Sequence, residues 1–301
     1  MIGRKIKGLN PPLNPKHKLA VLRPVRPAAT HLPGTGQKIS DRRPIGRLQG
    51  IHLFWLLLIF GVSAFAAGNQ SAADQPSIVK TILIWTPLLL KGFGFNILIS
   101  FMSMSIGTVM GAILGVLQIS LLLPVRLSSR FLTQFFRNSP WLVLLFYCMF
   151  MIPFEISIGG LRIPFPDWIK AVIGLSLPVM ANVSEIVRGA INSIPSGQWE
   201  ASESLAFSRH QQIWLIILPQ CYKRMLPPWM NLYAILTMAT VLASIVGVEE
   251  VMTLAGQVLA ADGRPELLVP IYSFVLVWFF AYCYPIARWT IRLERKFVLK
   301  S

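Results

Sequence analysis

The longest uncharged stretch of the chain limits what it can fold into. No residue from Gly92 to Leu122 carries a charge, and the stretch exceeds the about 20 apolar residues that a helix needs to cross a bilayer. Within it, Ser103, Gly107, Gly111 and Gly115 recur at every fourth position. Such a row of small residues lets two membrane helices approach to backbone contact. The stretch therefore predicts a transmembrane helix packed closely on a second helix.

Composition agrees with an integral membrane protein. Apolar residues make up 54% of the chain, charged residues make up 13%, and the mean hydropathy is +0.60. The formal net charge of +16 could suggest a nucleic-acid partner. However, 11 of the 28 Lys and Arg residues lie in residues 1–50, and most others flank apolar runs. We therefore expect membrane lipid and no nucleic acid as a partner, and an all-α membrane fold.

Apolar runs predict about six transmembrane helices. Besides the uncharged stretch, the expected spans are residues 51–68, 141–155, 168–187, 228–248 and 267–291. Residues 78–90 contain Lys80, Trp85 and Pro87, which favour an interfacial helix. Short polar links are expected around residues 126–137 and 249–266.

The N-terminal region is expected to form a disordered tail followed by a membrane helix. Residues 1–50 contain seven prolines and scattered basic residues without apolar periodicity. The run that follows ends in Ala64-Phe65-Ala66, which also fits a signal-peptidase site. The preceding basic region is about twice the length of a whole signal peptide, which favours an uncleaved helix. Residues 78–301 are then expected to form the main membrane domain.

The distribution of basic residues predicts the orientation. If the N-terminus lies inside, 23 of the 28 Lys and Arg residues fall in or beside cytoplasmic segments. Such a bias is typical of inner-membrane proteins with cytoplasmic positive charge. We therefore expect both termini, and the polar segment at residues 194–219, to lie in the cytoplasm.

One polar segment, Ile194–Pro219, lies between two apolar blocks, and we name it the polar loop. Pro195 begins a first short helix, and a turn follows near residues 206 and 207. Ser208 and Gln211 have the spacing of a capping box that opens a second helix. We expect Pro219 to end that second helix, because proline lacks the backbone N–H.

The polar loop resembles the EAA loop of ABC importer permeases. The family pattern is E-A-A, a glycine four residues on, and I-x-L-P, and the matching residues are Glu200, Ala201, Ser202, Ala206, Ile216, Leu218 and Pro219. Several flanking segments resemble the polar amino acid branch of that family. They are Phe136–Val143, Glu185–Gly189, Gly197–Glu200, Leu218–Gln220 and Pro227–Pro228.

This resemblance implies the type I ABC importer permease fold and a role in the bacterial inner membrane. The chain would form the translocation pathway for polar amino acids, together with a second permease chain. A periplasmic or extracellular binding protein would deliver substrate, and a dimer of ATP-binding subunits would hold ATP and Mg²⁺. The residues implied to couple to that ATPase are Gly197, Glu200, Ala201, Ser202, Glu203, Ala206, Leu218 and Pro219.

Other chemistry has little support in the sequence. No G-x-x-x-x-G-K-[ST] motif is present, and the four histidines are too dispersed for a metal site. We therefore expect neither an enzyme nor a resident cofactor. The alternative function is an ion-coupled secondary transporter or a channel for small polar solutes. The expected spans lack buried carboxylates for ion coupling, and Glu185 is expected to pair with Arg188.

Two departures from the family pattern have consequences. Ala206 replaces the usual glycine, which costs about 1 kcal/mol if the turn is left-handed. Met238-Ala239 replaces a Lys-Asp pair found in many relatives, which suggests that the second permease is a different chain.

Polar residues in the fourth and fifth spans are candidate pathway residues: Asn182, Thr237, Thr240 and Ser244. Each must bond to substrate, to water or to another helix.

Overall fold

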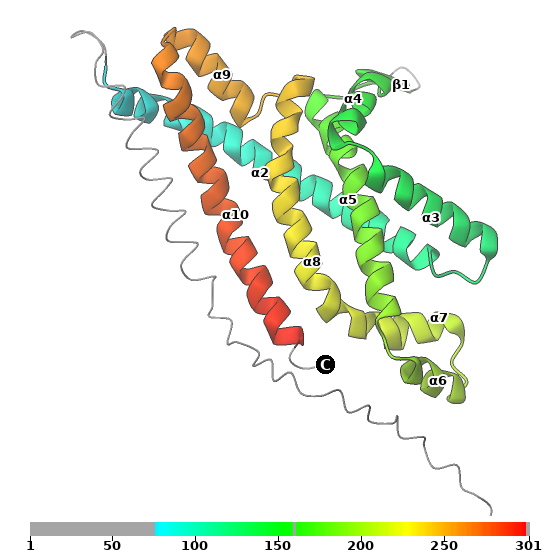
Figure 1. The fold of residues 1–301 in the computed structure, drawn as a ribbon. Helices are drawn as coiled ribbons and strands as arrows, with labels where there is room; N and C mark the ends of the chain where they lie inside the picture. Colours follow the sequence, from blue (N-terminus) through cyan, green and yellow to red (C-terminus); the bar gives the residue numbers. More distant parts are fainter. Residues whose placement is uncertain (1–75, 159–160, 299–301) are drawn as a thin grey trace, which may run out of the picture. The chain divides into compact units, whose positions relative to one another are not determined.

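The computed structural model describes residues 76–158 and 161–298. The expected tail and first membrane helix, residues 1–68, lie outside this part of the chain. The helices (Figure 1) are α2 Ile78–Leu117, α3 Leu123–Asn138, α4 Trp141–Met151, α5 Asp167–Asn192, α6 Ser196–Ser204, α7 Arg209–Gln211, α8 Leu218–Ala239, α9 Val251–Asp262 and α10 Leu268–Val298. A π-helical segment, Gln212–Ile217, joins α7 to α8, and 3₁₀ segments cover Thr240–Val246 and Pro265–Leu267. The antiparallel strands β1 Glu155–Ile158 and β2 Leu161–Pro164 form a hairpin.

In the described ranges, four helical stretches are long and apolar enough to cross a membrane. They are Ile78–Leu117, Asp167–Asn192, Arg209–Val246 and Pro265–Phe297. The helices α4 and α9 are apolar but shorter, so the span expected at residues 141–155 has only 11 helical residues. The architecture is that of an all-α membrane protein carrying one short hairpin.

The row of small residues on α2 packs against α5, as predicted. A Cβ atom added at Gly107, Gly111 or Gly115 would lie 2.5, 2.6 or 2.7 Å from the nearest α5 atom. The hydroxyl of Ser103 donates to the carbonyl of Val172 on α5 at 3.1 Å. Only residues without a large side chain allow this approach. The α2–α5 contact therefore forms the spine of the domain.

Buried apolar side chains form two clusters. The larger is centred on α5, where Leu175 and Val179 are fully buried. The smaller joins α9 and α10 to the first part of α2, where Phe93 meets Phe279 edge to face at 5.1 Å. Both clusters use α2, which explains its length.

The segments expected on either side of the uncharged stretch were wrong. The segment 78–90 is not a separate interfacial helix, because α2 continues through Pro87 into the uncharged stretch. The link around residues 126–137 is the 16-residue helix α3, which has a proline in its first turn. Arg130 and Arg137 are exposed and Arg126 is half-buried, whereas Ser129 and Thr133 are buried. Leu123, Leu127, Phe131 and Phe135 recur at every fourth position, so the sequence carried a periodicity that indicates an amphipathic helix. These apolar side chains are exposed in the structure.

Candidate docking loop and polar cavity

The first helix of the polar loop, α6, begins after Pro195 as predicted. Ser202 on this helix is buried, and its hydroxyl donates to the carbonyl of Trp199 at 2.7 Å. Gly197, Ala201 and Leu205 are exposed, and their spacing of four residues puts them on one face. Leu205 is 72% exposed. The loop thus presents a face of small residues that ends in one large apolar side chain, which we name the α6 face.

The acidic residues implied to take part in coupling lie beside this face. Glu200 and Glu203 are exposed, and neither forms an ion pair within residues 76–158 and 161–298. Leu218 is half-buried and Pro219 is exposed. The two carboxylates are therefore available to basic groups of another protein.

The turn after α6 is left-handed, so the cost considered for Ala206 applies. Ala206 has φ 58°, the one positive φ at a non-glycine residue in the described part of the chain. The N–H of Phe207 donates to the carbonyl of Ser202 at 3.2 Å, and the N–H of Ala206 donates to that of Glu203 at 2.9 Å. This pair of bonds is the Schellman motif, in which glycine is normally the left-handed residue.

Ala206→Gly is therefore expected to make the loop more stable. Glycine removes the Cβ clash of the left-handed conformation, and the greater freedom of the unfolded chain offsets part of this gain. We expect about 1 kcal/mol or less, measured as slower amide hydrogen exchange in residues 205–208. Gly197→Ala, in the same loop but at a helical position, serves as the comparison. Faster exchange in Ala206→Gly would contradict the assigned strain.

The second helix begins as predicted but continues past the expected end. The hydroxyl of Ser208 accepts from the N–H of Gln211 at 3.4 Å, and the Gln211 side chain accepts from the N–H of Ser208 at 2.9 Å. Pro219 does not end the helix, which runs from Arg209 to Val246. The turn before Pro219 is π-helical, and Pro219 lies in the first turn of α8. The helix therefore does not need the backbone N–H that proline lacks at this position.

Side-chain contacts tie the polar loop to the membrane helices. Arg224 on α8 donates through Nη1 to the carbonyl and the hydroxyl of Ser193, at 2.6 and 2.8 Å, at the end of α5. The guanidinium of Arg209 lies 4.2 Å from the ring centroid of Trp199 on α6. The first contact joins α8 to the end of α5, and the second joins α6 to the start of the helical stretch that continues into α8.

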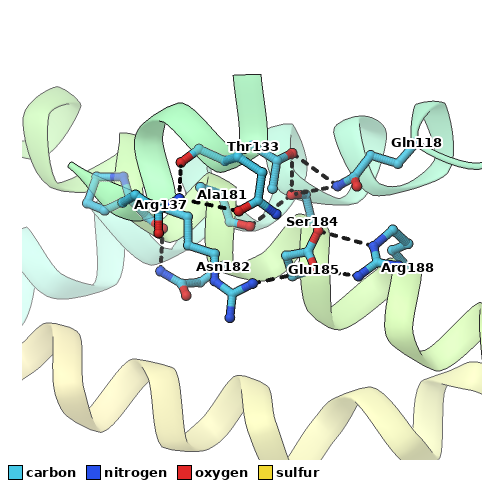
Figure 2. Close-up of polar contacts among 11 residues, drawn as sticks. Gln118, Thr133, Arg137, Ala181, Asn182, Ser184, Glu185 and Arg188 are labelled. Atoms are coloured by element: carbon cyan, nitrogen blue, oxygen red, sulfur yellow. Dashed lines mark hydrogen bonds and ion pairs between the residues drawn. The ribbon is translucent and has the colours of Figure 1, made fainter. Parts of the chain in front are cut away.

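A cavity of about 690 Å³ lies next to this connection. Its polar lining residues come from α3, α5 and α8, and they are Arg137, Asn182, Glu185, Ser193, Arg224 and Asn231. Figure 2 shows Glu185 between two arginines. Its carboxylate accepts from Arg188 at 2.6 and 3.1 Å, which confirms the predicted pair, and lies 3.6 Å from Arg137. The negative charge is thus already neutralised by the chain.

A buried polar network that the sequence did not predict lies beside this cavity. Figure 2 shows Gln118 at the end of α2, Thr133 on α3 and Ser184 on α5 meeting one another. The amide of Gln118 donates to both hydroxyls at 3.0 and 3.2 Å, and the two hydroxyls lie 3.0 Å apart. Each residue alone resembles an ordinary polar residue near a helix end. Together they join three helices.

The four candidate pathway residues do not form one cluster, although the hydroxyl of Thr240 donates to the carbonyl of Thr237. Asn182 lines the cavity and donates to the carbonyl of Pro178 at 2.8 Å. Thr237 and Thr240 are buried and donate to backbone carbonyls of their own helix at 3.0 and 2.7 Å. Ser244 is half-buried and donates to a carbonyl one turn earlier at 2.7 Å.

The segment expected to be a polar link at residues 249–266 is mostly the apolar helix α9, so that expectation was wrong. A buried carboxylate lies directly before this helix, outside the spans for which no buried carboxylate was expected. Glu250 is fully buried and caps α9, accepting from the N–H groups of Met252 and Thr253 at 2.8 and 3.1 Å. Asn96 on α2 donates to Glu250 at 2.7 Å and to Thr240 at 3.0 Å. The signal available in the sequence was an acidic residue directly before an apolar helix, which is the composition of an N-cap.

Comparison with known proteins identifies membrane components of transport systems as relatives of this chain. The family described as "Binding-protein-dependent transport system inner membrane component" matches residues 104–287. A probable amino-acid ABC transporter permease protein, YckA of Bacillus subtilis, is 35% identical over 70% of this chain and 89% of its own length. The L-cystine transport system permease protein TcyB of the same organism is 30% identical over 69% of this chain and 88% of its own length.

Solved structures have the same fold. A crystal structure of an amino acid ABC transporter with histidines aligns with a TM-score of 0.63 at 21% identity, covering 74% of this chain and 99% of the other. The inward-facing MetNI methionine ABC transporter aligns with a TM-score of 0.56 at 20% identity, covering 71% of this chain and 97% of the other.

Proposed function

Because this chain belongs to the family of inner membrane components of binding-protein-dependent transport systems, we propose that it imports polar amino acids. The chain is the permease subunit of an ABC importer. The names of its relatives support the substrate class, since they include permeases for cystine and arginine. ATP and Mg²⁺ are held by partner subunits, and a separate binding protein delivers the substrate.

Docking of the ATP-binding subunit is assigned to the α6 face, and the exposure of that face carries the proposal. Gly197 and Ala201 leave room for a groove to close over the helix, and Leu205 offers an apolar anchor that is 72% exposed. A large apolar side chain in water at the tip of a polar loop is costly unless a partner covers it. The contacts of Arg224 with Ser193 then pass the motion of the ATPase to α5.

Leu205→Asn tests this assignment. Burying a leucine is worth about 1.5–3 kcal/mol, so we expect about 10- to 150-fold weaker retention of the ATP-binding subunit during purification. Leu121→Asn is the matched control, because Leu121 is 73% exposed and lies in the connection between α2 and α3. If both variants retain the ATP-binding subunit equally well, the α6 face is not part of the interface with that subunit.

The proposed assembly holds this permease and a second, different permease chain. The absence of the Lys-Asp pair at Met238-Ala239 supports specialisation between the two halves. Both termini and the polar loop lie on the cytoplasmic side, because the basic residues concentrate there. A purified transporter that contains two copies of this chain, no other permease, and full ATP-driven uptake would disprove the heteromer.

The translocation pathway is proposed to pass Asn182, with Thr237, Thr240 and Ser244 as further candidates. Asn182 has the stronger support, since it lines a cavity and its amide oxygen has no hydrogen bond to the described residues. Single cysteine replacements, made in a chain lacking its three native cysteines, are treated with a water-soluble thiol reagent in each nucleotide state. A site that reacts in no state does not belong to the pathway.

A further inference from the structure

A second cavity lies at the opposite end of α5 from the polar loop. Its volume is about 720 Å³, within the range of roughly 300–1,000 Å³ typical of small-molecule sites. Asp167 and Trp168, at the start of α5, form part of its wall, whereas the polar loop follows the last turn of that helix. The 26 residues of α5 correspond to about 39 Å. If the polar loop meets the ATPase, this cavity lies on the side from which an importer receives its substrate.

The cavity contains one available positive charge and one available negative charge. Lys91 on α2 and Glu249 before α9 both line it and are exposed. Neither forms an ion pair with any residue that the structure describes. Asp167 also lines the cavity, but its carboxylate lies 3.4 Å from the Nζ atom of the fully buried Lys170, which neutralises it.

The remaining wall is apolar and leaves space. The rings of Phe95 and Trp168 line the cavity with centroids 6.0 Å apart. An added Cβ at Gly94 would meet no atom within 4 Å, so the space beside this glycine is open. Gln257 adds an exposed amide. Opposite charges beside an apolar wall match a molecule that carries an ammonium, a carboxylate and a side chain.

We propose that this cavity binds a free α-amino acid at the entry side, with Glu249 contacting the ammonium and Lys91 contacting the carboxylate. The proposal rests on the proposed function, to which it adds a defined recognition site. Recognition of both charged groups explains how one site accepts amino acids with different side chains, because the α-ammonium and the α-carboxylate are common to all of them.

Direct binding tests the site. The complete transporter in nanodiscs, without binding protein, is titrated with each of the radiolabelled proteinogenic L-amino acids. Those that bind are then compared with their amides and their N-acetyl derivatives, each of which lacks one charge. We expect either derivative to bind at least about tenfold more weakly. Glu249→Gln is expected to abolish the penalty of N-acetylation, and Lys91→Gln is expected to abolish the penalty of amidation.

A space-filling variant gives an independent test. Gly94→Leu places a side chain in the cavity and is expected to abolish amino acid binding. Gly256→Leu is the control, because an added Cβ there also meets no atom within 4 Å and Gly256 does not line the cavity. Loss of binding in both variants, or in neither, would contradict the site.

Two further results would overturn this proposal without touching the proposed function. In one, wild-type transporter shows ATP-driven uptake but binds no free amino acid, or the Lys91 and Glu249 variants show the same preference for the amino acid over its derivatives as wild type. In the other, these variants weaken docking of the binding protein while amino acid binding is unchanged, which would make the cavity a protein-docking surface. Absence of ATP-driven amino acid uptake in wild type would instead refute the proposed function.

Discussion

Ala201→Trp is expected to release the ATP-binding subunit while the membrane helices stay folded. Ala201 lies on the exposed α6 face, outside the long apolar helices, so the larger side chain disturbs no packing within the chain. In a groove that closes over α6, the added volume costs about 1–3 kcal/mol, which weakens docking roughly 5- to 150-fold. Uptake and ATP hydrolysis stimulated by the binding protein are expected to fall with it.

The measurement is the amount of ATP-binding subunit that co-purifies with each variant at equal permease expression. Ser196→Trp is the control, because Ser196 is exposed on α6 but lies about 140° around the helix from Ala201. Glu200→Ala is expected to act in the same direction as Ala201→Trp but more weakly, since an exposed charge contact is worth about 1 kcal/mol or less. Full uptake by Ala201→Trp would show that the ATPase docks elsewhere.

Gly111→Ala is expected to separate the two central helices of the domain. The added Cβ would lie 2.6 Å from the carbonyl oxygen of Met180 and 2.7 Å from the Cβ of Val183, both on α5. A backbone atom cannot move aside as the end of a long side chain can, so α2 and α5 must shift apart. Overpacking of this kind costs about 1–3 kcal/mol and occasionally more, and we expect the upper end of that range.

Thermal unfolding of the purified permease in detergent checks this expectation. Gly256→Ala is the control, because it adds the same methyl group to a helix at a site with no atom within 4 Å. We expect the midpoint to fall by several degrees in Gly111→Ala and to stay within about 1 °C of wild type in Gly256→Ala. Equal midpoints in the two variants would mean that α2 and α5 lie farther apart than the distances at Gly111 indicate.

The close contact between α2 and α5 shows how far local sequence signals reach. The four-residue spacing of Ser103, Gly107, Gly111 and Gly115 predicted a close helix contact, and α5 provides it. The identity of the partner helix did not follow, because spacing describes one face of one helix. The start of α6 and the Ser208 capping box were also predictable, since both depend on hydrogen bonds between residues a few positions apart.

Local backbone geometry and tertiary contacts decided the features for which the sequence-based predictions were wrong. The helix continues through Pro219 because the turn before it is π-helical, and this turn changes the backbone hydrogen-bond pattern at the proline. Glu250 appeared to be a solvent-exposed link residue, and its burial depends on Asn96, more than 150 positions earlier in the chain. The sequence by itself determined the membrane class, the small-residue contact face and the polar loop, because their signals repeat within a few turns. Only the folded chain decided which polar groups are buried together and where the two cavities lie, because burial and enclosed space depend on residues far apart in sequence.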